Sequence, residues 1–151
     1  MVIHVVLLDA GPLGLASNPR YSPQNVTCAQ WLYALVSGGV RVIVPEIADY
    51  EIRRELLRAG RTRGIARLDA MVNWLEYLPI TTATMRRAAQ FWAQARRMGQ
   101  PAASDQSLDA DMILAAQAAT LGAAETVIAT TNVGHLAPFA TAELWQNITA
   151  T

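Results

Sequence analysis

The sequence of 151 residues contains no lysine, one cysteine and few charged side chains. Its twelve arginines are balanced by twelve acidic residues, so the formal net charge is zero. A balanced charge provides no bulk field to draw the chain to polyanions, and any nucleic-acid contact must be local. The single Cys28 excludes an internal disulfide and a multi-cysteine metal site, and it suits a protein of the reducing cytoplasm.

Long hydrophobic runs are also missing. No apolar stretch reaches the roughly 20 residues of a membrane-spanning helix. The apolar residues 1–8 lack a basic n-region and are soon followed by Asp9 and a Gly-Pro pair, which makes a poor signal peptide. We therefore expect a cytoplasmic protein without membrane contact. Hydrophobic residues still make up 52% of the chain, so we expect residues 1–151 to form one domain with its own core.

Strand and helix patterns alternate along the whole chain. Residues 2–8 form a continuous apolar run, typical of a strand buried on both faces of a parallel sheet. Residues 11–23, GPLGLASNPRYSP, are interpreted as a loop. Further strands are expected at residues 41–45, 78–81, 125–131 and, more weakly, 142–148. Helices are expected at residues 24–39, 46–60, 66–78, 82–99 and 108–122. The alternation predicts a three-layer α/β/α sandwich with a central, mainly parallel sheet of about five strands.

All basic residues are arginines, and they are clustered. Seven of the twelve fall between Arg41 and Arg67, and two further pairs stand at residues 86–87 and 96–97. The planar guanidinium group matches phosphate oxygens better than an ammonium does, so these clusters are candidate phosphate contacts. Codon bias and an ordinary solvated helix face are the alternative, and the sequence leaves both open.

Acidic and amide side chains follow the predicted strands, where ligands of open α/β sheets bind. These residues are Asp9, Glu46, Asp49, Glu51, Asp109, Asp111 and Asn132. Carboxylates that converge at one sheet edge suit Mg²⁺ or Mn²⁺, which prefer oxygen ligands. Most of them also have a structural interpretation, as helix-dipole partners or turn residues. Asp9 differs, because burial at the tip of a central strand is costly unless the carboxylate is paired, hydrogen-bonded or metal-bound.

The two aspartates of the segment SLDADMILAAQA cannot have the same role. Two steps along a helix turn through about 200°, so their side chains face opposite ways. Asp111 shares its face with Ala115, Ala118 and Gly122, small residues that let a helix lie close to a sheet. We therefore place Asp111 in the site and interpret Asp109 as a helix cap or a neighbour of the site.

Four segments, VVLLDA, IVPEIADYEIRREL, DADMILAAQA and VIATTNVGHL, resemble the motifs of the PIN domain family and span nearly the whole chain. The resemblance implies a compact α/β/α domain with a parallel sheet. It also implies an Mg²⁺- or Mn²⁺-dependent ribonuclease, as in the VapC-like toxins of toxin–antitoxin pairs. By position, Asp9, Glu51 and Asp111 become the catalytic residues and metal ligands.

Other positions receive lesser roles. Asn132 stands where the family often has aspartate, with Thr130 as a hydroxyl beside it, and Arg53 and Arg54 are candidates for holding flanking phosphates. The segment GPLG departs from the family, because it lacks the usual Ser or Thr after the first aspartate. His135 falls where the family commonly has an acid or a histidine, and a solvent-facing loop histidine is the alternative.

The mechanism implied is metal-assisted hydrolysis of RNA phosphodiester bonds. A non-catalytic PIN-fold module that binds RNA or a partner protein is the alternative, supported by Asn132 and the missing hydroxyl. A phosphotransferase with Asp9 as nucleophile is disfavoured, because Gly11 stands where a second aspartate is needed.

Association and aromatic packing were also inferred from the helical patterns. Residues 84–98 and the helix around Trp74 carry much apolar surface, so we expect a homodimer or an antitoxin-bound assembly. Trp31, Trp74 and Trp92 stand in amphipathic patterns and are expected to contribute mainly to packing.

Overall fold

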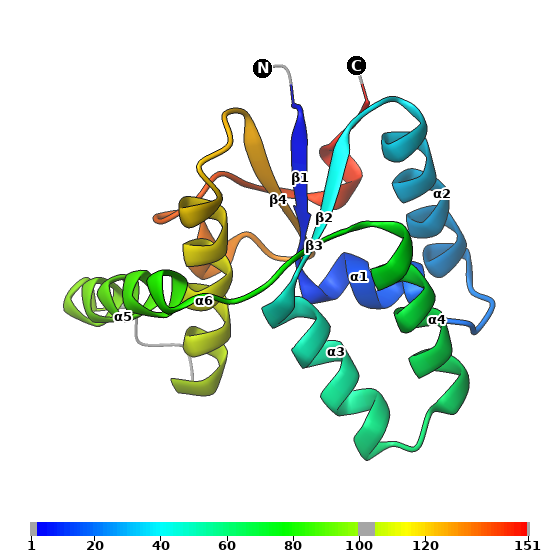
Figure 1. The fold of residues 1–151 in the computed structure, drawn as a ribbon, viewed down its shortest axis with the longest axis horizontal. Helices are drawn as coiled ribbons and strands as arrows, with labels where there is room; N and C mark the ends of the chain where they lie inside the picture. Colours follow the sequence, from blue (N-terminus) through cyan, green and yellow to red (C-terminus); the bar gives the residue numbers. More distant parts are fainter. Residues whose placement is uncertain (1–2, 100–104, 151) are drawn as a thin grey trace.

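The computed structural model describes residues 3–99 and 105–150. Five strands form one sheet in the order β3-β2-β1-β4-β5, and every neighbouring pair is parallel. Helices cover both faces of the sheet, with α5 and α6 on one side and α2 and α4 on the other (Figure 1). The predicted three-layer α/β/α sandwich is therefore confirmed. Across the described ranges, no helix has the length and apolarity to cross a membrane.

The three central strands are β1 (Val5–Leu8), β2 (Arg41–Pro45) and β4 (Thr126–Thr130). β1 is buried along its whole length because helices pack on both of its faces. Val6 and Leu8 belong to one core, and Val5 and Leu7 belong to the other. The apolar run was predicted to begin at Val2, which lies outside the described residues.

The two edge strands are short and differ from their predicted positions. β3 spans Glu76–Leu78 and β5 spans Ala142–Leu144, whereas strands were predicted at 78–81 and 142–148. β3 pairs with β2 from Glu76, which lies opposite Ile43, to Leu78. It ends before Pro79, because proline has no N–H group to donate to a neighbouring strand. Beyond β5 the chain turns into the short 3₁₀ helix η2, Trp145–Asn147, because Trp145 is buried in the core.

Within the described residues, five α-helices follow the predicted order. They are α2 (Pro23–Ser37), α3 (Glu46–Arg58), α4 (Thr62–Trp74), α5 (Thr82–Arg97) and α6 (Asp105–Leu121). α4 begins four residues before its predicted start, because Gly60, with φ of 65°, ends α3 and the chain re-enters helix at once. α6 begins three residues earlier than predicted, which changes the interpretation of the acids that it carries.

The segment interpreted as a loop after β1 contains a helix, α1, Ala10–Ser17. Its sequence AGPLGLAS has two glycines and a proline, which argue against a helix. Pro12 lies in the first turn, where its missing N–H would have no partner within the helix. Leu13 and Ala16 are buried against α2 and the sheet, and this burial outweighs the weak helix propensity.

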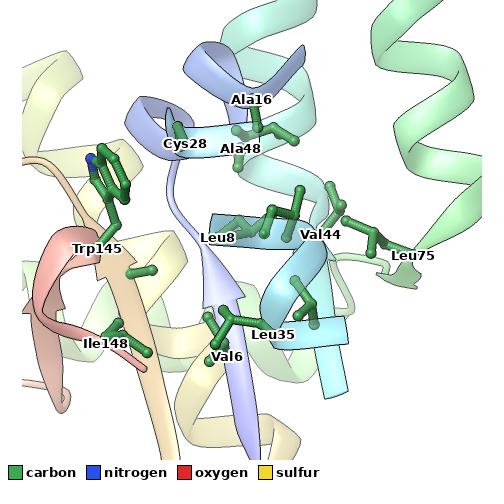
Figure 2. Close-up of a cluster of buried hydrophobic side chains, with 14 of the residues drawn as sticks. Val6, Leu8, Ala16, Cys28, Leu35, Val44, Ala48, Leu75, Trp145 and Ile148 are labelled. Atoms are coloured by element: carbon green, nitrogen blue, oxygen red, sulfur yellow. The ribbon is translucent and has the colours of Figure 1, made fainter. Parts of the chain in front are cut away.

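The core on the α1 side of the sheet packs directly beneath the end of β1. Figure 2 shows Leu8 and Val44 surrounded by side chains from α1, α2, α3 and the segment after β5. Burying one such side chain contributes about 1.5–3 kcal/mol. The carboxyl ends of β1 and β2 therefore rest on a closely packed base.

A fully buried glutamine links α6 to two other elements. The Oε1 atom of Gln117 accepts a hydrogen bond of 3.2 Å from the backbone N–H of Ile47, at the start of α3. Its Nε2 atom donates a hydrogen bond of 2.8 Å to the carbonyl of Leu78, at the end of β3. One side chain thus fixes the starting point of α3 relative to α6.

Candidate functional site

Three carboxylates from three elements lie near one another beyond the carboxyl ends of β1 and β2. Asp9 follows β1, Glu51 lies in the second turn of α3, and Asp111 lies in the second turn of α6. Each of these side chains is at least partly buried, and their negative charges interact. The structure thus brings together the three acids that the PIN resemblance selected.

Asp9 is held by hydrogen bonds to both carboxylate oxygens. Oδ1 accepts from the backbone N–H of Ala10 at 2.7 Å, and Oδ2 accepts from the hydroxyl of Thr130 at 2.7 Å. An N-cap side chain usually bonds to the second or third residue of its helix, but Pro12 is the third residue of α1 and has no N–H. Burial raises the pKa of Asp9, and these two hydrogen bonds partly oppose that increase.

Thr130 connects Asp9 to the loop after β4. Its buried hydroxyl oxygen accepts a hydrogen bond of 3.1 Å from the backbone N–H of Asn132. The side-chain oxygen of Asn132 in turn accepts from the N–H of Gly134 at 3.0 Å. The exposed Asn132 amide therefore shapes the loop, and its Oδ1 atom is already engaged there.

Burial and like charge make Glu51 and Asp111 weak acids. Burial first, and then repulsion by Asp9 and Asp111, raises the pKa of Glu51 to about 7, while the charge of Arg54 opposes this increase. Burial and repulsion by Asp9 raise the pKa of Asp111 to about 6, and His135 opposes that increase. The group lacks enough positive charge to balance three carboxylates, and a cation would supply it.

The other three acids of α3, Glu46, Asp49 and Glu55, have structural partners, and Glu55 pairs with Arg58 at 2.8 Å. Oε1 of Glu46 accepts a hydrogen bond of 2.6 Å from the backbone N–H of Ile80. Asp49 is buried, accepts from the hydroxyl of Tyr77 at 2.9 Å and pairs with Arg53 at 3.0 Å. Glu51 is therefore the acid of this helix that turns toward Asp9.

The two arginines after Glu51 have different surroundings. Arg53 forms ion pairs with Asp49 and Asp69, the second at 2.7 Å, so its guanidinium group is already engaged on the opposite side of α3. Arg54 is exposed, lies over the ring of Tyr50 and is close enough to Glu51 to lower the pKa of that acid. Of the pair, Arg54 is the one placed to reach a phosphate near the acids.

The structure separates the two aspartates of α6. Asp111 is partly buried between the buried residues Ala110 and Met112, whereas Asp109 is exposed. The interpretation of Asp109 as a helix cap is wrong, because α6 begins at Asp105 and Asp109 already lies within the second turn. The backbone N–H groups that a cap would satisfy belong to the first turn.

His135 is a site neighbour that the sequence could not distinguish from a loop histidine. It lies in the 3₁₀ helix η1, Gly134–Leu136, which packs against α6 through the buried Leu136. This contact brings the partly buried imidazole close enough to Asp111 to lower the pKa of that acid. The sequence contained a pointer to it, since His135 stands three residues after Asn132 in the segment NVGHL.

The chemistry of these residues fits a hard divalent cation. Asp9, Glu51 and Asp111 offer oxygen ligands, and their mutual repulsion is the imbalance that Mg²⁺ or Mn²⁺ would relieve. Within the described part of the chain, however, no group of three or more acidic, histidine or cysteine side chains is already arranged to hold an ion. Ions that retain several waters need only one or two direct carboxylate ligands, so the donor set fits in type.

A groove of about 960 Å³ begins beside the acids and runs between α1, α3 and α4. Its lining includes Ala10 and Gly11, which directly follow Asp9 in the chain. Its other lining residues are Gly14, Leu15, Ser17, Asn18, Pro19, Arg20, Ile52, Glu55, Leu56, Arg58, Ala59, Gly60, Arg61, Thr62, Arg63 and Gly64. The groove is thus mainly apolar, and four arginines contribute to its lining.

Packing is confirmed for most of the tryptophans, with one exception. Trp145 is buried and Trp31 and Trp92 are partly buried, but Trp74 is 47% exposed. Trp74 lies at the last position of α4, where the chain turns away toward β3, and it stacks on the exposed ring of Tyr33 with centroids 5.7 Å apart. The helical pattern could not show that this end of α4 leaves the core.

The parallel sheet, its strand order and the helices on both faces define a PIN-like fold, as the sequence motifs predicted. The same fold occurs in the crystal structure of VapBC2 from Rickettsia felis, which is bound to a DNA fragment from its own promoter. That match has a TM-score of 0.70 at 13% sequence identity and covers 93% of this chain and 98% of that one.

Two further solved structures have this fold. DNA-bound VapBC from Salmonella typhimurium matches with a TM-score of 0.64 at 18% identity, covering 96% of this chain and 99% of that one. FitAcB from Neisseria gonorrhoeae matches with a TM-score of 0.70 at 19% identity, covering 95% and 99%. No family model and no curated protein sequence matches this chain. These likenesses therefore concern the fold.

Proposed function

We propose that this protein is an Mg²⁺- or Mn²⁺-dependent endoribonuclease and the toxin of a toxin–antitoxin pair. The observation that carries the proposal is the interaction of three carboxylates, Asp9, Glu51 and Asp111, beyond the carboxyl ends of β1 and β2. Carboxylates that come together from separate elements, with pKa values raised by burial and by one another's charge, form a donor group that suits a divalent cation. The neighbouring VapBC and FitAcB structures, which are toxin–antitoxin complexes, support the toxin assignment.

Each residue has a distinct part in the proposed reaction. When bound, the metal ion activates a water for attack and stabilises the leaving oxygen. Asp9 holds a fixed orientation through Ala10 and Thr130. Glu51 and Asp111 complete the acidic pocket. Arg54 holds a phosphate oxygen of the RNA.

The test is cleavage of mixed RNA by the purified protein with Mn²⁺ and with EDTA. We expect cleavage with Mn²⁺, none with EDTA, and none from Asp9→Asn or Asp111→Asn. Asp109→Asn is the matched control, because it removes the same charge from an exposed position of the same helix. Cleavage that survives EDTA, or that the three variants affect equally, contradicts the proposal.

A non-catalytic module is the second candidate, and one observation favours it. Asn132 replaces a charge, and its Oδ1 atom is used by Gly134, which reduces the acidity of the pocket. This candidate predicts RNA binding without cleavage at every Mn²⁺ concentration. The same assay therefore decides between the two.

The antitoxin partner is proposed to occupy the groove between α1, α3 and α4. Its apolar lining and the four arginines in that lining, Arg20, Arg58, Arg61 and Arg63, suit an amphipathic segment with acidic residues. A segment bound there would reach Ala10 and Gly11 and so cover Asp9. The full protein is proposed to act in the cytoplasm.

Co-expression with the product of the neighbouring gene, followed by affinity purification, tests this partner. Ala59→Arg places a bulky charge in the groove and should abolish co-purification and inhibition of cleavage. Ala89→Arg, a substitution of an exposed alanine on α5, should change neither. The homodimer expected from the sequence stays a prediction, and light scattering at micromolar concentration would show it as twice the mass of one chain.

A further inference from the structure

The helix α5 has the most one-sided charge among the helices of residues 3–99 and 105–150. It carries Arg86, Arg87, Arg96 and Arg97 and no acidic residue. Since the whole chain is neutral, the remainder has four more acids than arginines. A positively charged helix can attract a polyanion locally, even though the net charge of the whole chain is zero.

The geometry of α5 separates its packing face from its basic face. Thr84, Ala88 and Ala95 are buried, and α6 is the main element against which they pack. Arg86, Gln90, Ala93 and Arg97 are spaced four, three and four residues apart, so they form one line on the side away from α6. We call this line the α5 ridge.

The two arginines of the α5 ridge have no ion pair or hydrogen bond within the described residues. By contrast, Arg41, Arg53 and Arg58 all pair with acids of this chain. Arg86 and Arg97 stand about 16 Å apart along the helix, and small or amide side chains lie between them. A flexible, evenly charged chain can contact both.

We propose that the α5 ridge binds the phosphate backbone of RNA on the flank of the cleaved bond. This proposal deepens the ribonuclease function and rests on it for the identity of the polyanion. α6 connects the two surfaces, because Ala95 of α5 packs on Leu108 and Met112 while Asp111 of the same helix turn belongs to the acid site. With helix diameters of roughly 10 Å, the ridge lies about 20 Å from the acids.

Charge explains why such a surface is needed. The three carboxylates repel RNA until a cation binds, so the acid site by itself contributes little to the first encounter with the substrate. Arginines at a distance attract the backbone without competing for the metal ion. RNA contacts of this kind position the chain and carry no sequence preference.

The test measures binding of a labelled single-stranded RNA of about 20 nucleotides to the metal-free protein by fluorescence anisotropy. At about 3.4 Å per nucleotide, such an RNA is long enough to span the distance from the acids to the ridge. The double variant Arg86→Ala/Arg97→Ala should weaken its binding about tenfold. It should also lower the slope of log K against log[salt] by about 2.

Arg41→Ala/Arg67→Ala is the matched control, because it removes two exposed arginines that lie outside both the α5 ridge and the groove. Equal weakening of RNA binding by both double variants would overturn the proposal. It would show that RNA binding depends on the total charge and not on the position of the arginines. Unchanged binding in Arg86→Ala/Arg97→Ala, with circular dichroism showing intact folding, would overturn it as well. Failure of the ribonuclease function would instead appear as no Mn²⁺-dependent cleavage by the unsubstituted protein, and the metal-free binding result is independent of that outcome.

Discussion

The hydroxyl of Thr130 donates a hydrogen bond of 2.7 Å to Oδ2 of Asp9 and so joins the carboxyl ends of β1 and β4. Both residues are largely buried, and the two strands are neighbours in the sheet. The bond favours the charged form of Asp9, against the effect of burial. The segment after β4 thus influences the acid site through this contact with Asp9 as well as through His135, which lies close to Asp111.

Thr130→Val removes this hydroxyl without changing the size of the side chain. We expect a loss of about 1–3 kcal/mol of unfolding free energy, because the Asn132 N–H and one Asp9 oxygen lose a buried partner. The pKa of Asp9 should rise further, so the acidic limb of the cleavage profile should move to higher pH. Thr130→Ser keeps the hydroxyl and should preserve that limb, and a shift of equal size in both variants would show that packing, not the hydrogen bond, matters.

Asp111→Asn and Asp109→Ala should have opposite signatures. Asp111→Asn should reduce cleavage by more than ~100-fold, since even residues that support metal ligands contribute 10–100-fold. Its Tm should hold or rise, because carboxylate repulsion is relieved. Asp109→Ala should change stability by less than ~0.5 kcal/mol and keep cleavage, because its side chain is exposed and caps nothing. Loss of cleavage in Asp109→Ala alone would move the ligand assignment to that residue.

Glu51→Gln should be more stable than the unsubstituted protein at pH 8 and equally stable near pH 4. The folded-state pKa of Glu51 is about 7, above the usual value of 4.5, so the folded protein binds more protons than the unfolded chain between these values. Stability therefore falls as pH rises through this window, and the glutamine removes that loss. A gain of about 3 °C in Tm at pH 8 corresponds to roughly 1 kcal/mol.

Added Mn²⁺ gives this prediction a second readout. An ion that binds only the folded protein raises Tm as the ion concentration increases. At 100 times its Kd, the ion adds about 2.7 kcal/mol to the free energy of unfolding. Glu51→Gln should lose most of this gain while keeping its advantage without metal. A metal-independent Tm in the unsubstituted protein would contradict the ligand assignment.

Gly11→Ala should destabilise α1 although alanine is the better helix former. A Cβ at position 11 would lie 2.6 Å from Cγ2 and 2.7 Å from Oγ1 of Thr131. We expect a net loss of about 1–2 kcal/mol, because this overlap outweighs the roughly 0.5–1 kcal/mol that alanine gains in a helix. Adding Thr131→Ala should restore most of the stability in a double-mutant cycle. Additive losses would show that the two side chains do not meet.

The sequence predicted the architecture because buried parallel strands and amphipathic helices follow simple periodicities. The apolar runs ending at Asp9 and Pro45 placed the central strands, and the acids at their ends followed from the geometry of a parallel sheet. The choice of Glu51 over Glu46 and Asp49 needed the family resemblance. The structure gives it a reason, since the other two acids are hydrogen-bonded elsewhere.

The remaining features depend on tertiary contacts that no local pattern encodes. α1 forms because burial of Leu13 outweighs its glycines, and β3 is set by its register with Ile43. In the sequence, Gln117 could not be distinguished from any other polar residue of a helix. Its hydrogen bonds to Ile47 and Leu78 depend on the packing of α6 against α3 and β3. His135 reaches Asp111 only through the packing of Leu136 on α6.

The shortness of the two outer strands restricts how this molecule can aggregate or be extended. β3 and β5 have three residues each, and the last carbonyl of β3, at Leu78, is already bound by Gln117. A foreign peptide that aligned with either strand would gain few backbone hydrogen bonds before meeting Pro79 or the turn at Trp145. We therefore expect that other chains do not bind this protein by adding a strand to the edge of its sheet. They must contact its helices instead.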